Sequence, residues 1–205
     1  TPIAFWGPWH TPENKKEGSL ADVARSVAAM IKPEIILDIL QYFTLFATDK
    51  KHRKIKIVCR YQQYEGANLI VERVKAGYPK KGLIWHFQGS GKSLLMVFAA
   101  GKLRMIPELK NPTVVIVDDR IDLETQITAD FNSADIPNLY SASSKQELVD
   151  FFVQDIRKIM ITTVFKFGEV DSVLNERDNI ILMVVEAHRT QEGDLGEKMR
   201  MALPN

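Results

Sequence analysis

The sequence has little cysteine and no long apolar run. Cys59 is the single cysteine among 205 residues, so no disulfide forms within the chain, which is typical of a reducing, intracellular setting. One cysteine and four scattered histidines (His10, His52, His86 and His188) also provide no zinc tetrad. No apolar stretch reaches the roughly 18 residues that a membrane span needs, and the N-terminus lacks the order of a secretory signal. We therefore expect a cytoplasmic protein with no membrane contact.

A large excess of charge of one sign is also missing, because the formal net charge is +1. A global electrostatic attraction to nucleic acid is therefore not predicted. The basic residues are nevertheless unevenly spread, and six of them fall within one short stretch: Lys50, Lys51, Arg53, Lys54, Lys56 and Arg60. This stretch is either a solvated basic loop or a patch that contacts phosphates, and the sequence leaves both readings open.

The first third of the chain predicts an irregular segment followed by helices. Three prolines and two glycines within residues 1–18 exclude a long helix there. Helical spacing covers 20–30, and a second helix is predicted to begin at Pro33, with an apolar face that continues to Phe46. Residues 55–58 alternate in polarity, as a short strand does.

From Gly66 onward the pattern becomes α/β. Apolar strands are predicted at 82–86, 114–117, 138–140, 158–162 and 180–185. Helices are predicted at 69–74, 93–105, 122–131 and from the capping residue Ser144 through Phe152. Continuous apolar strands that alternate with helices favour a parallel sheet covered by helices on both faces. The predicted fold is an α/β domain with a parallel sheet, preceded by a short helical and irregular segment.

The strongest chemical signal is the run Gln88, Gly89, Ser90, Gly91, Lys92 and Ser93, between a predicted strand and a predicted helix. Glycines allow several backbone N–H groups to point at one anion, and the helix that follows adds its partial positive charge. Lys92 is suited to the β- and γ-phosphates of ATP, and the Ser93 hydroxyl to Mg²⁺. The general pattern has glycine where this chain has His86, so only the Gly-x-Gly-Lys-Ser core matches. A flexible Gly-Ser turn is the simpler alternative.

A second signal, Glu186, follows the most apolar predicted strand. A carboxylate at the end of such a strand is suited to orient or activate an attacking water. The residue before it, which could hold Mg²⁺ if it were an aspartate, is Val185. The alternative is a glutamate at a strand end, with His188 serving only to cap or pack. Asp118 and Asp119 end another apolar strand and compete for the metal role, although we expect their continuation to begin a helix that contacts nucleic acid.

Taken together, these segments resemble superfamily 2 helicases and translocases, and above all the motor region of the restriction (R) subunit of type I restriction-modification enzymes. The segments that carry the resemblance are 60–67, 82–93, 119–126, 162–167 and 186–191. The Trp-His pair before the loop and His-Arg-Thr-Gln after Glu186 separate this family from general helicases. His86 is expected in this family, and Val185 is the clear departure from it.

The resemblance implies a role for each matching residue. Glu186 and Lys92 would be catalytic, with Mg²⁺ held by Ser93. ATP would be bound by Gln63 and Arg60 at the adenine, and by Gln88, Gly89, Ser90, Gly91, Lys92 and Ser93 at the phosphates. Arg120, Gln126 and Thr163 would lie along the DNA. The intact subunit would translocate double-stranded DNA with ATP, cleave it with a separate endonuclease domain, and assemble with modification and specificity subunits.

The resemblance also implies a RecA-like P-loop fold and a domain division. Residues 1–54 would precede the motor, and 55–205 would form its first lobe, without the second lobe or the nuclease site, so we expect the chain to be a fragment. Another superfamily 2 DNA motor, and an ATP-binding switch that does not hydrolyse, remain as alternatives. The sequence does not reveal the DNA recognition sequence or the oligomeric state. It also does not show whether Val185 is the natural residue.

Overall fold

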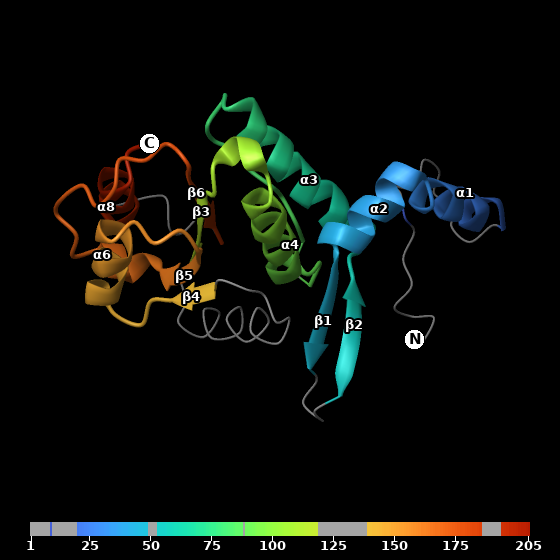
Figure 1. Ribbon diagram of the computed structural model, residues 1–205, viewed down its shortest axis with the longest axis horizontal. Coiled ribbons are helices and arrows are strands. Elements are labelled where there is room, and N and C mark those ends of the chain that lie inside the picture. The colour runs from blue at the N-terminus through green and yellow to red at the C-terminus, as the bar shows by residue number, and fades with distance from the viewer. Residues whose placement is uncertain (1–8, 10–19, 49–52, 88, 119–138, 186–193) are drawn as a thin grey trace. The chain divides into compact units, whose positions relative to one another are not determined.

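The computed structural model describes residue 9 and residues 20–48, 53–87, 89–118, 139–185 and 194–205 (Figure 1). The chain forms two compact units, Thr1–Ala99 and Ala100–Asn205. The division between them falls inside helix α4, Lys92–Arg104. Each unit is described by itself.

The first unit opens with helices α1, Leu20–Met30, and α2, Pro33–Tyr42. Both helices were predicted, and Pro33 occupies the first turn of α2, where its missing N–H has no intrahelical partner to lose. The predicted continuation of this helix to Phe46 is wrong. Thr44 donates its hydroxyl to the Ile39 carbonyl at 3.0 Å, which satisfies an acceptor at the helix end. The chain then continues as strand β1, Thr44–Thr48, so its apolar residues belong to a sheet.

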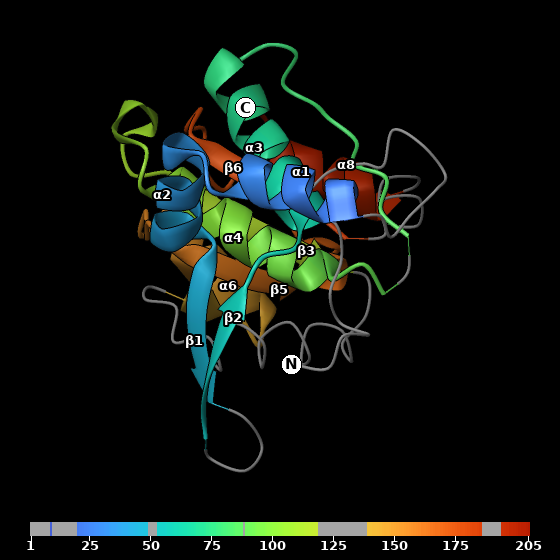
Figure 2. The ribbon, with the colours of Figure 1, turned by 90° about the vertical axis from the view of Figure 1, so that its right-hand side faces the viewer.

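Strand β1 forms an antiparallel hairpin with β2, Lys54–Val58, which the sequence predicted as a strand (Figure 2). Phe46 faces Lys56 across the ladder. Cys59 is buried directly after β2, and its N–H donates to the Phe43 carbonyl at 3.1 Å. Helix α3, Tyr61–Ala76, includes the predicted helical segment 69–74 and ends at Gly77, which has φ of 69°.

The predicted buried strand at 82–86 is wrong. Residues 81–87 belong to neither a helix nor a strand, and Trp85 is 90% exposed. The residues pass alongside α3 and border a groove of about 350 Å³ together with residues such as Gly66 and Leu69. An apolar run indicates a strand only where a neighbouring strand offers hydrogen bonds, and among the described residues no strand pairs with this segment.

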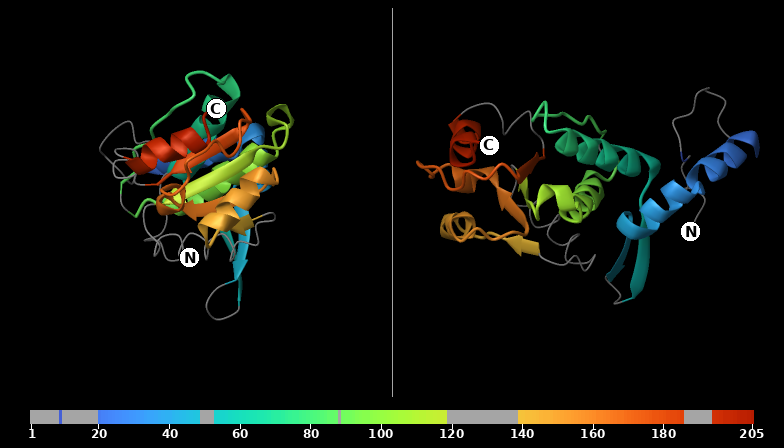
Figure 3. Two further views of the ribbon diagram at one scale, coloured as in Figure 1. Left: turned by 90° about the vertical axis from the view of Figure 1, so that its left-hand side faces the viewer. Right: turned by 45° about the horizontal axis from the view of Figure 1, so that its top comes forward.

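The second unit is built on a four-stranded parallel sheet. Its strands are β3 (Thr113–Asp118), β4 (Leu139–Ser141), β5 (Ile159–Thr163) and β6 (Ile180–Val184), in the order β4-β5-β3-β6 (Figure 3). Each was predicted, and the predicted parallel pairing is confirmed. Every residue of β3 and β5 is buried, as the continuous apolar runs indicated.

Helices of the second unit cover this sheet. Short 3₁₀ helices η2, Pro107–Leu109, and η3, Val164–Phe167, accompany α6, Lys145–Val153, and α8, Asp194–Ala202. Side chains of α6, η3 and α8 pack with those of β3 and β5 in one core, which includes Val115, Phe151, Met160, Phe167 and Met199. Ser144 caps α6 as predicted, because its hydroxyl accepts the Glu147 N–H at 3.2 Å. No helix was predicted at α8.

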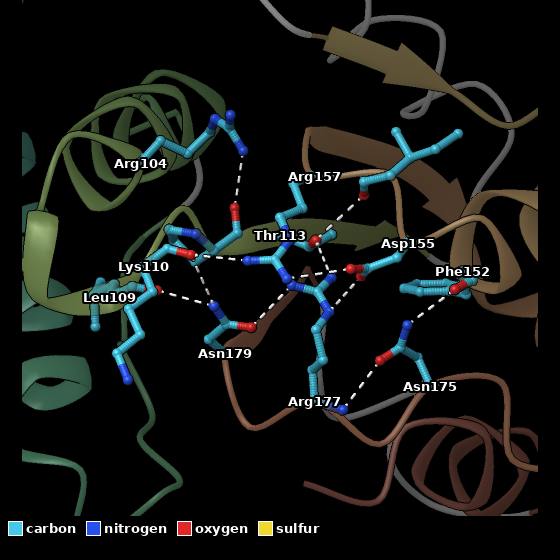
Figure 4. Close-up of polar contacts among 12 residues, drawn as sticks. Arg104, Leu109, Lys110, Thr113, Phe152, Asp155, Arg157, Asn175, Arg177 and Asn179 are labelled. Atoms are coloured by element: carbon cyan, nitrogen blue, oxygen red, sulfur yellow. Dashed lines mark hydrogen bonds and ion pairs between the residues drawn. The ribbon is translucent and has the colours of Figure 1, made fainter.

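A polar cluster lies at the amino ends of the parallel strands (Figure 4). Arg177 donates to Thr113 Oγ1 at 2.6 Å and to Asn179 Oδ1 at 2.9 Å. Its Nε lies 2.6 Å from Asp155 Oδ1, but that N–H has no hydrogen-bond acceptor, so this contact is an ion pair only. Asn179 in turn donates to the carbonyls of Leu109 and Lys110. The cluster joins the residues before β3, β5 and β6 at the edge opposite to the strands' carboxyl ends.

Two negative findings apply to the described part of the chain. Within it no helix is both long and apolar enough to cross a membrane. Over the same residues, no cluster of three or more His, Cys, Asp or Glu side chains is arranged to hold a metal ion.

Candidate phosphate-binding loop and sheet edge

The predicted phosphate-binding loop is a tight turn that leads directly into α4. Gly89 and Gly91 have φ of 79° and 84°, in the left-handed region that glycine adopts at no steric cost. The Gly91 carbonyl accepts the Leu95 N–H at 3.1 Å, so it starts the helical hydrogen bonds of α4. Lys92 is the first residue of the helix, and both Lys92 and Ser93 are half-buried. The loop therefore presents a helix N-terminus and a lysine to one space.

Gln63 of α3 contacts this loop. Its Oε1 accepts the backbone N–H of Arg60 at 2.8 Å, which caps the start of α3, and its Nε2 donates to the Gly91 carbonyl at 3.1 Å. The side chain is 2% exposed. A Cβ added at Gly91 would lie 2.3 Å from Gln63 Nε2, so glycine is required there both by its φ and by this close approach. Arg60 itself is exposed.

His86 contacts the loop within the same unit. Its Nδ1 lies 3.2 Å from Ser90 Oγ, and Ser90 is 3% exposed. The Ser90 N–H also donates to the Phe87 carbonyl at 3.3 Å. Burial lowers the pKa of the imidazole, and the positive charge of Lys92 lowers it further, against an opposing effect of Glu65. The neutral ring is therefore favoured near pH 7.

Within the second unit, the carboxyl ends of three strands meet. Asp118 is opposite Thr163 in the register of β3 with β5, and the Val185 N–H donates to the Val117 carbonyl at 2.8 Å. Asp118 and Thr163 are buried, and Val185 is half-buried. The sheet thus brings Thr163, Asp118 and Val185 to one edge, the edge at which ligands bind in open parallel α/β sheets.

Four predicted site residues lie outside the described residues: Gln88, Glu186, Arg120 and Gln126. The same is true of Asp119, His188 and the predicted helix at 122–131. Their expected roles stay predictions. The structure brings together Gln63, Arg60, His86 and the loop within the first unit, and Thr163, Asp118 and Val185 within the second.

The described loop residues fit a nucleoside triphosphate with its divalent cation. Two glycines with positive φ form the turn, and the close approach of Gln63 leaves no room for a Cβ at Gly91. Backbone N–H groups at a helix N-terminus attract anions, and an ammonium group and a hydroxyl stand beside them in Lys92 and Ser93. These donors suit phosphate oxygens and a cation that the phosphates already hold.

Two contacts in this site were not predicted. The sequence singled out Gln63 for adenine and noted His86 as a departure from the general pattern, but it did not connect either residue with the loop. Helical spacing places Gln63 in the first turn of α3, which is the position of a capping side chain. That cap was a readable signal. The contact between α3 and the loop joins residues that are 28 positions apart, and no local signal predicted it.

A glycine-turned loop before a helix and a parallel α/β sheet together define an ATPase domain of the P-loop class. The chain belongs to the SWI2/SNF2 ATPase family, which matches residues 62–205. This agrees with the predicted RecA-like fold and superfamily 2 motor region.

Its curated relatives are endonuclease subunits of type I restriction enzymes. The type I restriction enzyme HindI endonuclease subunit of Haemophilus influenzae is 37% identical over 206 residues, which cover 91% of this chain and 19% of the relative. A putative subunit of Methanocaldococcus jannaschii, MjaIXP, is 32% identical over 189 residues, with 86% and 18% covered. The SauCOLORF180P subunit of Staphylococcus aureus is 24% identical over 204 residues, with 96% and 21% covered. The chain spans about a fifth of the length of these relatives.

Proposed function

We propose that this chain is the ATP-binding motor lobe of a type I restriction enzyme R subunit, which translocates double-stranded DNA with ATP and, in the intact subunit, cleaves it. The observation that carries the proposal is the loop from Gly89 to Ser93 at the start of α4, in a chain of the SWI2/SNF2 ATPase family. The relatives, which are endonuclease subunits of type I restriction enzymes, support restriction as the setting. Residues 1–54 would precede the motor, and 55–205 would form its first lobe.

The proposed mechanism assigns each step to a residue. Lys92, Gln88, Ser90 and the N–H groups of Gly89 and Gly91 hold the phosphates. Ser93 would hold Mg²⁺, which would supply positive charge against the charge that develops on the phosphates. Glu186 orients the attacking water as a general base. Electrostatic stabilisation of the transition state by the lysine and the loop is the largest expected contribution.

Recognition of adenine and DNA belongs to other residues in this proposal. Gln63 and Arg60 contact the adenine; Gln63 retains one N–H and one lone pair beyond its two protein contacts. Arg120, Gln126 and Thr163 lie along the DNA. Modification and specificity subunits complete the assembly in the cytoplasm.

The test of the proposal is Lys92→Ala, measured in the protein at its full natural length. DNA-stimulated ATP hydrolysis is expected to fall by at least roughly a hundredfold, because a preorganised charge at the phosphates is lost, while the thermal midpoint stays near the wild-type value. Lys81→Ala, an exposed lysine in the same unit, is the matched control and should leave hydrolysis unchanged. Wild-type turnover by a folded Lys92→Ala protein would end the assignment.

A second candidate is an ATP-binding switch that does not hydrolyse, and Val185 favours it. A valine at the end of β6 binds neither a metal nor its waters. Val185→Asp in the same protein separates the two candidates. A rise in ATP turnover shows that the wild-type motor lacks one metal-holding acid. Unchanged, substantial turnover shows that another acid, Asp118 or Asp119, already serves. No turnover in either protein supports the switch.

A further inference from the structure

His86 occupies the position at which the general phosphate-loop pattern has glycine, and the proposed function gives it no role. In the structure its ring makes a contact within the protein. Nδ1 lies 3.2 Å from Ser90 Oγ, and Ser90 is a buried residue inside the loop. A hydroxyl at this distance from an imidazole nitrogen makes a hydrogen bond in either tautomer. This side-chain contact connects the first and the last residue of the five-residue segment 86–90.

Helix α3 supports the ring on its other side. A Cβ added at Gly66 would lie 3.3 Å from His86 Nε2 and 2.7 Å from Leu95 Cδ1, so the backbone of α3 approaches both the ring and the first turns of α4. Gly66 is buried. The imidazole therefore occupies a defined place between α3 and the loop, and its two nitrogens have different neighbours.

Gln63, three residues before Gly66 on the same helix, holds the far side of the loop. Its Nε2 donates to the Gly91 carbonyl at 3.1 Å, directly after the residue that His86 contacts. Ser90 and Gly91 are thus each held by one side chain, and the two side chains are ordered by α3. The proposed function directs the N–H of Gly91 at the phosphates, whereas the N–H of Ser90 donates to the Phe87 carbonyl.

We propose that His86 is a positioning residue, which fixes Ser90 and, together with Gln63 on Gly91, holds the phosphate loop in its anion-binding curl. This inference rests on the proposed function, because it names what keeps that same loop preorganised. A loop that already has its binding conformation binds ATP more tightly, because binding then costs less conformational entropy. Neutral His86 leaves Lys92 as the cation that meets the phosphates.

The decisive comparison is between two amide substitutions. His86→Asn places a polar group close to the position of Nδ1, which Ser90 contacts, whereas His86→Gln places it nearer to the position of Nε2. Ser90→Ala removes the other partner and only one hydroxyl. All are made in the protein at its full natural length, and ATP affinity is measured by equilibrium binding with Mg²⁺ present.

His86→Gln and Ser90→Ala are each expected to weaken ATP binding about threefold to tenfold, which corresponds to one neutral hydrogen bond. His86→Asn should stay within about twofold of wild type, and His86→Gln combined with Ser90→Ala should be no weaker than the weaker single variant, because both remove the same contact. Equal losses for Asn and Gln, multiplicative losses in the double variant, or no loss for His86→Gln and Ser90→Ala would overturn the inference.

A measurement without nucleotide separates this inference from the proposed function. Hydrogen exchange of the peptide that spans 82–94 should be faster in His86→Gln and Ser90→Ala than in wild type and His86→Asn. If this pattern appears while ATP binding is absent or insensitive to Lys92→Ala, His86 positions the loop but the ATPase assignment fails. If ATP binds through Lys92 while the exchange rates of all four proteins agree, the ATPase assignment stands and His86 does not position the loop.

Discussion

Cys59, the single thiol of the chain, follows β2 and is buried. Burial raises the pKa of this thiol to about 12, from a usual value near 9.0, and the carboxylate of Asp38 contributes in the same direction. Because only the thiolate is nucleophilic, the folded protein carries an inert cysteine. The residue therefore acts as a small apolar side chain in the packing of the first unit.

The prediction for Cys59 concerns alkylation at pH 8. A rise of about three pKa units lowers the thiolate fraction about a thousandfold, so iodoacetamide should modify the folded chain at least about a thousandfold more slowly than the chain in concentrated urea. Mass spectrometry of timed samples measures both rates. Comparable rates in the two conditions would show that the thiol is accessible and ordinary.

At the scale of single elements, two helix glycines have opposite surroundings. Gly101 lies inside α4, and a Cβ added there would meet nothing within 4 Å. Gly66 lies inside α3, and a Cβ there would come within 2.7 Å of the buried Leu95 side chain. The first glycine only weakens its helix, whereas the second permits close packing.

Substitution by alanine should therefore change stability in opposite directions. Gly101→Ala is expected to raise the free energy of unfolding by about 0.5–1 kcal/mol, because alanine is the better helix former. Gly66→Ala should lower it by about 1 kcal/mol or more, since overpacking costs about 1–3 kcal/mol and exceeds the helical gain. Urea unfolding followed by circular dichroism measures both; destabilisation by Gly101→Ala would contradict the first part.

The Arg177 cluster joins three parallel strands at their amino ends. Arg177 donates to Thr113 and Asn179 and pairs with Asp155, so its removal takes away two hydrogen bonds and an ion pair. Asp155 keeps its ion pair with Arg157, so the loss falls mainly on Thr113 and Asn179. Arg177→Ala should therefore destabilise the protein by about 1–3 kcal/mol. Arg73→Ala, at an exposed position of α3, is the control and should stay within about 0.5 kcal/mol. The measurement is the urea midpoint of each variant. Equal midpoints would show that the contacts of Arg177 are incidental surface contacts.

At the scale of the whole molecule, the chain comprises two compact units and spans about a fifth of the length of its curated relatives. In motors of the proposed type, a second lobe supplies an arginine that contacts the nucleotide. Such an arginine finger contributes about 10³–10⁵ to the rate. The 205-residue chain is thus expected to retain phosphate contacts through Lys92 and the loop but to lack most of the catalysis.

We therefore predict that the isolated chain hydrolyses ATP at least roughly a thousandfold more slowly than a full-length relative such as the Haemophilus influenzae subunit, with duplex DNA present in both cases. ATP binding by the chain should fall less than its turnover, because the loop and Lys92 are retained. Steady-state phosphate release gives the turnover, and equilibrium binding gives the affinity. Turnover within tenfold of the relative would show that the chain completes its own catalytic site.

Much of the second unit followed from local sequence. The strands β3, β5 and β6 are runs of apolar residues separated by helices, and such runs are stable only when both faces are buried, so their parallel pairing was predictable. The cap of α6 at Ser144 was predictable for a similar reason, because a capping side chain acts within three residues of itself. The glycine turn of Gly-x-Gly-Lys-Ser and the helix after it were predictable, since positive φ and a helix N-terminus are local properties.

The sequence by itself thus determined the family and the parallel sheet, and it predicted a phosphate-binding loop. Only the tertiary structure decided which apolar segments find a hydrogen-bonding neighbour: Thr44–Thr48 leaves the predicted helix because β2 pairs with it, and 82–86 is exposed because no described strand does. It also decided that Gln63 and His86 meet the loop. Contacts between residues far apart in the chain depend on how helices pack, and hydrophobic spacing along one segment carries no information about its distant partner.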